Sequence, residues 1–164
     1  MAKYDDMKAR EQRKRYYDYA IGIDTGVHTA IAIWDCNLKK FVHIETTMLH
    51  RALLFIYKFK ETCEQNGEHF YVKIEDARQR KWFGERSQYK LQGAGSVKRD
   101  AKIWEDFLRD MKLDFDMVAP KQQMGFTKLT DAAFRRLTHY NGTTSEHARD
   151  AAMLVFSSTR TIPF

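Results

Sequence analysis

Short apolar runs alternate along this chain with longer amphipathic stretches, a pattern typical of strands and helices that pack in layers. The clearest run spans residues 19–34. Its apolar residues, separated mainly by small ones, are Ile21, Ile23, Val27, Ile31 and Ile33. This run predicts two buried strands joined by a tight turn, in which Gly26 provides a permissive backbone.

The rest of the pattern predicts three more strands and four helices. Asn66-Gly67 and Pro120 supply stop signals. The strands are expected at 40–46, 69–75 and 115–119, and the helices at 48–65, from the Gly93-Ala-Gly95-Ser96 segment to about 112, at 128–138 and at 145–158. Closely spaced strands favour antiparallel pairing, whereas helical crossovers favour parallel pairing. We therefore expect an α/β fold with one five-stranded mixed sheet flanked by helices.

Length and composition fit one domain over 16–164, preceded by a basic extension over 1–15. The extension carries six Lys or Arg against three Asp or Glu and no apolar segment, so we expect a disordered, solvated lead-in or an arm that contacts phosphates, and no secretory signal. Cys36 and Cys63 lie far apart, and no window is apolar enough to span a membrane, so a cytoplasmic protein is expected. The net charge of +6 favours a polyanionic partner.

Carboxylates follow two of the predicted strands. Asp24 ends the first strand, and Glu75 ends the strand at 69–75. Desolvation penalises a buried carboxylate unless a cation or hydrogen-bond donors meet it. For Asp24 alone, hydrogen bonds to the turn amides explain the residue as well as a metal or phosphate site does.

The last predicted helix adds a second pair, because His147 and Asp150 are three residues apart and share one helix face. Taken alone, they fit a surface His–Asp pair. If the helix start approaches the sheet edge with Asp24 and Glu75, the four side chains form a cluster suited to Mg²⁺ or Mn²⁺. Two such ions about 3.5–4 Å apart activate water for phosphodiester cleavage. The imidazole favours Mn²⁺ or serves as a base.

Together these motifs resemble those of RuvC-type Holliday junction resolvases, in the ribonuclease H-like superfamily. The resemblance covers about 17–158, and its most specific parts are Ile-Gly-Ile-Asp-Thr-Gly, the strand end Ile-Glu, the Gly-x-Gly helix start and His-Ala-Arg-Asp-Ala-Ala. It implies a ribonuclease H-like fold and four metal-binding positions, matched here by Asp24, Glu75, His147 and Asp150. The third position is Asp in some relatives and His in others, so His147 bears on which metal is preferred.

The resemblance also implies DNA contacts by basic residues. Lys121 and Lys128 match a stretch of the family that helps to bind DNA and supports cleavage. A lysine near the scissile phosphate would offset the negative charge that develops there. Both residues also fit ordinary surface lysines. In the loop after the strand at 69–75, cations surround two aromatics that either pack on the core or stack on exposed bases. Either aromatic would wedge into a junction. The loop residues concerned are Arg78, Arg80, Lys81, Trp82, Phe83 and Arg86.

The helix after the Gly93-x-Gly95 motif has three expected features. Its glycines are expected to permit a close backbone approach at the helix start, near DNA phosphate. Its apolar residues either join the core or, as the resemblance implies, a two-fold dimer; they are Val97, Ile103, Trp104 and Phe107. Its acidic residues are expected to form a solvated face, made of Asp100, Glu105, Asp106 and Asp110.

The function that the resemblance implies is a divalent-metal-dependent endodeoxyribonuclease that resolves four-way DNA junctions by paired nicks and leaves 5′-phosphates. A homodimer, a branch-migration helicase partner and a bacterial or phage origin are expected with it. Two alternatives stay open. One is another ribonuclease H-like nuclease that cuts an RNA–DNA hybrid or flap, and the other is a non-catalytic junction-binding protein.

Overall fold

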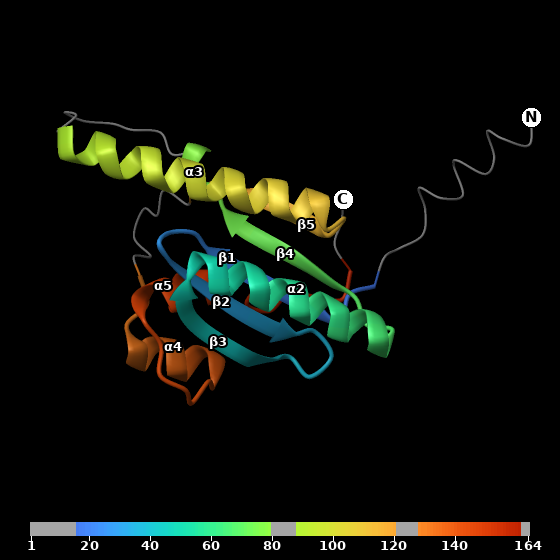
Figure 1. Ribbon diagram of the computed structural model, residues 1–164. Helices are drawn as coiled ribbons and strands as arrows, with labels where there is room; N and C mark the ends of the chain where they lie inside the picture. The colour runs from blue at the N-terminus through green and yellow to red at the C-terminus, as the bar shows by residue number, and fades with distance from the viewer. Residues whose placement is uncertain (1–15, 80–87, 121–127, 162–164) are drawn as a thin grey trace, which may run out of the picture.

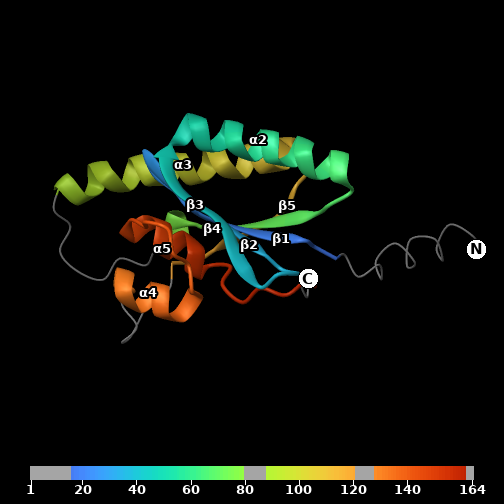
Figure 2. The same ribbon diagram turned by 90° about the horizontal axis from the view of Figure 1, so that it is seen from below.

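The computed structural model describes residues 16–79, 88–120 and 128–161, in which a five-stranded sheet lies between two layers of helices (Figures 1 and 2). The strands are β1 (Tyr19–Asp24), β2 (His28–Asp35), β3 (Lys40–Met48), β4 (Phe70–Glu75) and β5 (Asp114–Val118). The helices are α2 (Leu49–Asn66), the single 3₁₀ turn η1 (Ala77–Gln79), α3 (Gln88–Asp110), α4 (Asp131–Thr138) and α5 (Glu146–Met153). The predicted extension over 1–15 lies outside the described residues.

The sheet has the strand order β3-β2-β1-β4-β5. β1 pairs antiparallel with β2, and β2 with β3, whereas β4 joins β1 and β5 joins β4 in parallel. In this register Ile23 lies beside Ile74, and Glu75 lies beside Val118. The ends of three parallel strands therefore meet at one edge, and the predicted five-stranded mixed sheet is confirmed.

Side-chain alternation divides the sheet into two faces. Ile23 and Ile74 belong to the core that α2 and α3 cover. The opposite face packs against α4 and α5 (Figure 2). Since successive side chains of a strand point to opposite faces, Asp24 and Glu75 both belong to the face that α5 covers.

Helix α5 lies unusually close to β1 at Gly22. A Cβ added at Gly22 would stand 2.0 Å from the carbonyl oxygen of Ala151 and 3.3 Å from a methyl group of Val155. Only glycine allows this approach, so the backbone of α5 rests directly on the strand that ends at Asp24.

Capping residues set several helix limits. Gly67 ends α2 in the left-handed conformation, with φ 71°, as its sequence predicts. Thr130 caps α4 by accepting a hydrogen bond from the Ala133 amide, so this helix starts at Asp131, three residues later than predicted. Helix α5 ends at Met153, five residues before the predicted end, and the chain continues in turns.

Helix α3 corrects two predictions. It starts at Gln88, so Gly93 and Gly95 lie inside the helix, and a Cβ at Gly95 would meet nothing within 4 Å. The predicted helix start at these glycines is therefore wrong, and no other part of the described protein approaches Gly95 closely; an approach to DNA phosphate stays a prediction. Asp100 is not solvated but 2% exposed, because it precedes the fully buried Trp104 and Leu108 by one and two helical turns.

In the part of the chain that the structure describes, no helix combines the length and the apolar character needed to cross a membrane.

Candidate metal centre

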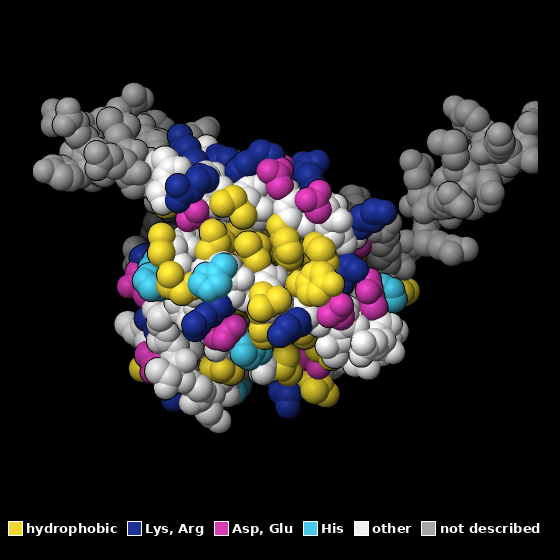
Figure 3. Space-filling view, in the orientation of Figure 1, with side chains coloured by type: hydrophobic (Ala, Val, Ile, Leu, Met, Phe, Trp, Pro, Cys, Tyr) yellow, Lys and Arg dark blue, Asp and Glu magenta, His cyan; other side chains and the backbone are white. Residues whose placement is uncertain are grey.

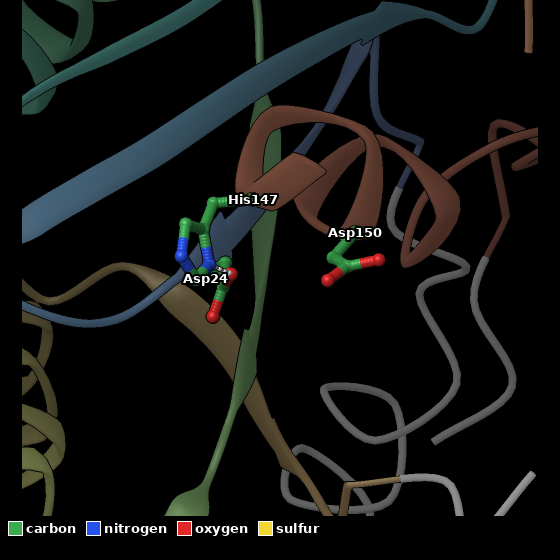
Figure 4. A group of neighbouring side chains, drawn as sticks. All are labelled: Asp24, His147 and Asp150. Carbon is green, nitrogen blue, oxygen red and sulfur yellow. Dashed lines mark hydrogen bonds and ion pairs between the residues drawn. The ribbon is translucent and has the colours of Figure 1, made fainter. Parts of the chain in front are cut away.

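Three of the four predicted ligands lie together where β1 ends and α5 begins. One potential ligand atom from each of Asp24, His147 and Asp150 lies within 4.8 Å of the other two. Figure 4 shows the His147 ring beside Asp24, with Asp150 farther along the same helix. Residues separated by more than a hundred positions in sequence thus form one compact donor set.

The closest contact in this group joins His147 to Asp24. The Nδ1 atom of His147 lies 2.8 Å from Oδ2 of Asp24. The Asp24 side chain is 16% exposed, whereas the imidazole is 62% exposed. The spacing in the sequence predicts a pair between His147 and Asp150 on one helix. The structure shows that His147 also contacts Asp24, at the end of a strand far away in the sequence.

Electrostatics at Asp150 favour an added cation. Burial raises the pKa of the Asp150 carboxyl, and the negative charge of Asp24 raises it further, while Lys128 opposes the shift. A divalent ion between the two carboxylates would remove this repulsion. Carboxylate oxygens with one imidazole nitrogen suit Mg²⁺ or Mn²⁺, so the residues present fit such a metal.

Glu75 lies at the neighbouring strand end but outside the three-residue group. The parallel register of β1 and β4 puts it next to Asp24, and strand alternation puts both on the face covered by α5. Its role as a fourth ligand stays a prediction.

Lys128 supplies a positive charge at the rim of the site. Its ammonium group forms an ion pair with Glu146, and its side chain is 58% exposed. The hydrogen bond to Glu146 raises the pKa of Lys128, and the charges of Asp150 and Asp24 add to the effect. The same contact lowers the pKa of Glu146. The predicted contact between Lys128 and a phosphate stays untested.

Arg78, predicted to bind DNA, makes ion pairs within the protein. Its Nε atom donates to Asp76 at 2.7 Å, and its Nη1 atom donates to Glu105 at 2.7 Å. Other predicted DNA-binding residues lie outside the described residues; they are Arg80, Lys81, Trp82, Phe83, Arg86 and Lys121.

One residue that anchors the site escaped the sequence analysis. Arg149, between the two predicted ligands of α5, donates from Nε to the Leu129 carbonyl at 2.7 Å and from Nη1 to the Thr144 carbonyl at 2.9 Å. These bonds tie α5 to the segments before both last helices. No local pattern signals them, because the acceptors are backbone oxygens brought close only by folding.

The strand order, with an antiparallel β1–β3 meander extended in parallel by β4 and β5, defines a ribonuclease H-like fold. Comparison with protein-family models and with curated protein sequences gave no match. Among solved structures, the chain is similar to T. thermophilus RuvC in complex with Holliday junction substrate, with a TM-score of 0.52 and 13% identity. The match covers 88% of this chain and 99% of that one. It confirms the predicted resemblance to RuvC as a likeness of fold.

Proposed function

We propose that this protein is a divalent-metal-dependent endodeoxyribonuclease that cuts four-way DNA junctions. One observation carries the proposal: β1 and α5 bring Asp24, His147 and Asp150 together at the edge of a ribonuclease H-like sheet. The similar RuvC structure contains a Holliday junction substrate. A junction is accordingly the first substrate to test.

The metal would be held by Asp24, Glu75, His147 and Asp150, as two Mg²⁺ or Mn²⁺ ions. When bound, such ions activate water and neutralise charge on a phosphodiester. The hydrogen bond between His147 Nδ1 and Asp24 would keep the imidazole at the site, either as a ligand or as a base that accepts a proton from water. Lys128 at the rim would offset the charge that develops on the phosphate. The products would carry 5′-phosphates and 3′-hydroxyls.

DNA binding is assigned to Lys128 at the rim of the site and to basic residues that the sequence singles out. Lys128 and Lys121 would contact phosphates, as would the loop cations Arg80, Lys81 and Arg86. Trp82 or Phe83 would stack on bases at the branch point.

A homodimer would offer two centres to the symmetric strands of a junction. Apolar side chains gather on the face that α2 and α3 form (Figure 3). Leu54 and Tyr57 on α2 are 51% and 42% exposed, and Ile103 on α3 is 36% exposed. We assign this face to a second copy of the chain. The expected helicase partner stays a prediction from the resemblance.

The test is incubation of the protein with an end-labelled synthetic four-way junction in Mg²⁺ or Mn²⁺. We expect paired nicks at symmetric positions, fewer nicks in a linear duplex of the same sequence, and none in EDTA. Preferential cleavage of an RNA–DNA hybrid or a flap would establish the alternative nuclease. Junction binding without cleavage in either metal would establish a non-catalytic binder.

Asp150→Asn separates binding from catalysis. We expect it to abolish nicking while the junction still binds, because it removes a metal ligand without reversing a charge. Asp106→Asn, an exposed acid on α3, is the matched control and should cut normally. Unaltered cutting by Asp150→Asn would refute the assigned centre.

A further inference from the structure

A buried carboxylate immediately follows Glu75 in the chain. Asp76 is 4% exposed, and its amide donates to the Val118 carbonyl at 2.7 Å, which continues the pairing of β4 with β5. Since strand side chains alternate, Asp76 projects to the sheet face covered by α3, and Glu75 projects to the other face, toward α5. A constraint on Asp76 therefore constrains the backbone that carries Glu75.

Hydrogen bonds hold this carboxylate on both of its oxygens. Oδ1 accepts from the Arg78 amide at 3.0 Å and from Arg78 Nε at 2.7 Å. Oδ2 accepts from Arg78 Nη2 at 2.9 Å and from Gln79 Nε2 at 3.2 Å. Gln79 Nε2 also donates to the Met117 carbonyl on β5 at 3.1 Å. The forked contact with Arg78 fixes both the distance and the angle between the groups.

Glu105 extends this contact to α3. It accepts from Arg78 Nη1 at 2.7 Å through one oxygen and from Arg109 Nη2 at 2.8 Å through the other. The Glu105 side chain is 16% exposed, and that of Arg78 is 30% exposed, so water screens these pairs only partly. The end of β4 is thus tied by charge to the C-terminal part of α3.

Both carboxylates of this network, Asp76 and Glu105, are ionised at neutral pH. Burial alone would raise the pKa of Asp76, but the hydrogen bonds from Arg78 and Gln79 outweigh it and leave the pKa below its ordinary value. Hydrogen bonds from Arg78 and then Arg109 lower the pKa of Glu105. Buried ion pairs add little net stability compared with apolar packing, so what this network contributes is a fixed geometry.

We propose that the ion-pair network of Asp76, Arg78 and Glu105 positions Glu75 for metal binding and couples this ligand to α3. The inference rests on the proposed function, because it takes Glu75 as a metal ligand. Arg78 is then a positioning residue and not a DNA contact. Loss of Glu105 would remove the tie between Arg78 and α3 and loosen the strand end, although Glu105 lies on the opposite face of the sheet from the proposed metal site.

The test is Mn²⁺ titration calorimetry on the full chain and on Glu105→Gln, in the absence of DNA. We expect Glu105→Gln to weaken Mn²⁺ binding about tenfold, the lower limit for outer-shell partners of metal ligands. Asp106→Asn is the matched control, since Asp106 is the next residue on α3 but pairs only with Lys102 among the contacts that the structure records for it. It should change the affinity less than twofold. Arg78→Lys, which keeps the charge but not the fork, should behave like Glu105→Gln.

A double variant separates positioning from general destabilisation. If Glu105 acts through Glu75, adding Glu105→Gln to Glu75→Gln should weaken Mn²⁺ binding no further. A full additional loss in that background, or equal affinity of Glu105→Gln and the unmodified chain, would overturn the positioning role alone. Absence of Mn²⁺ binding by the unmodified chain would overturn the proposed function and this inference together.

Discussion

The Cα of Gly22 on β1 lies so close to Ala151 on α5 that an added Cβ would stand 2.0 Å from the Ala151 carbonyl oxygen. Gly22 comes two residues before Asp24, and Ala151 directly follows Asp150. The contact therefore fixes the separation between the strand and the helix that carry the candidate ligands. A rigid backbone contact is well suited to hold ligands within coordination distance.

Gly22→Ala should destabilise the protein by about 3 kcal/mol, because neither backbone can yield to the new methyl group without shifting the core. Gly95→Ala is the matched control. It lies in a helix with open space around it and should stabilise by about 0.5–1 kcal/mol. Urea unfolding of both variants measures the difference. A neutral Gly22→Ala would mean that α5 does not rest on β1 as described.

Asp150→Asn should make the metal-free protein more stable at neutral pH. The folded state raises the pKa of this carboxyl above its ordinary value of 3.8, so ionisation costs stability as the pH rises through the raised pKa. Below pH 3.8 the carboxyl is protonated in both states and the advantage of asparagine disappears. In EDTA at pH 7 the melting temperature should rise by about 2 °C.

In excess Mn²⁺ the unmodified protein should instead melt at a higher temperature than Asp150→Asn. A metal that binds only the folded chain stabilises it, and the variant should bind Mn²⁺ more weakly. Melting curves with and without Mn²⁺ at pH 7 measure both effects. The prediction fails if Asp150→Asn melts below the unmodified protein in EDTA, or if Mn²⁺ stabilises the two equally.

Lys128→Ala should weaken junction binding. The slope of log K for binding against log salt concentration should become shallower by about one, as expected for the loss of one phosphate contact. Folding stability should change by less than about 0.5 kcal/mol, since the lysine is largely exposed. Lys102→Ala, an equally exposed lysine on α3, is the control. Binding titrations at several salt concentrations distinguish the two, and identical slopes would remove Lys128 from the DNA contact surface.

His147→Asp should shift metal preference from Mn²⁺ toward Mg²⁺, because it replaces an imidazole with a hard oxygen donor. Calorimetry measures the dissociation constant for each metal. The Kd for Mg²⁺ divided by the Kd for Mn²⁺ should fall by about tenfold. His147→Ala provides the comparison, since it should weaken both metals. An unchanged ratio in His147→Asp would show that the imidazole is not a ligand.

Local pattern was sufficient for the order and type of the main elements and for the five-stranded mixed sheet, but not for every helix boundary. The alternation over residues 19–34 predicts two strands, which form β1 and β2, and Asn66-Gly67 predicts the end of α2. These features depend on neighbours within a few residues. Helix α3 shows where such reasoning fails, because Gly95 appeared to mark a helix start and Asp100 a solvated face. The burial of Asp100 follows from how α3 packs on the sheet, with Trp104 and Leu108 in the core.

The sequence by itself determined which residues are candidates for the chemistry: acids at two strand ends, and a histidine and an acid on one face of the last helix. Only the tertiary structure decided that His147 meets Asp24, that Arg149 anchors α5, and that Arg78 pairs with Glu105. The physical reason is how far apart in the sequence the interacting residues lie. Side-chain alternation and helical spacing are set by local backbone geometry, whereas contacts between residues 20 or more positions apart exist only when the tertiary fold brings their atoms together.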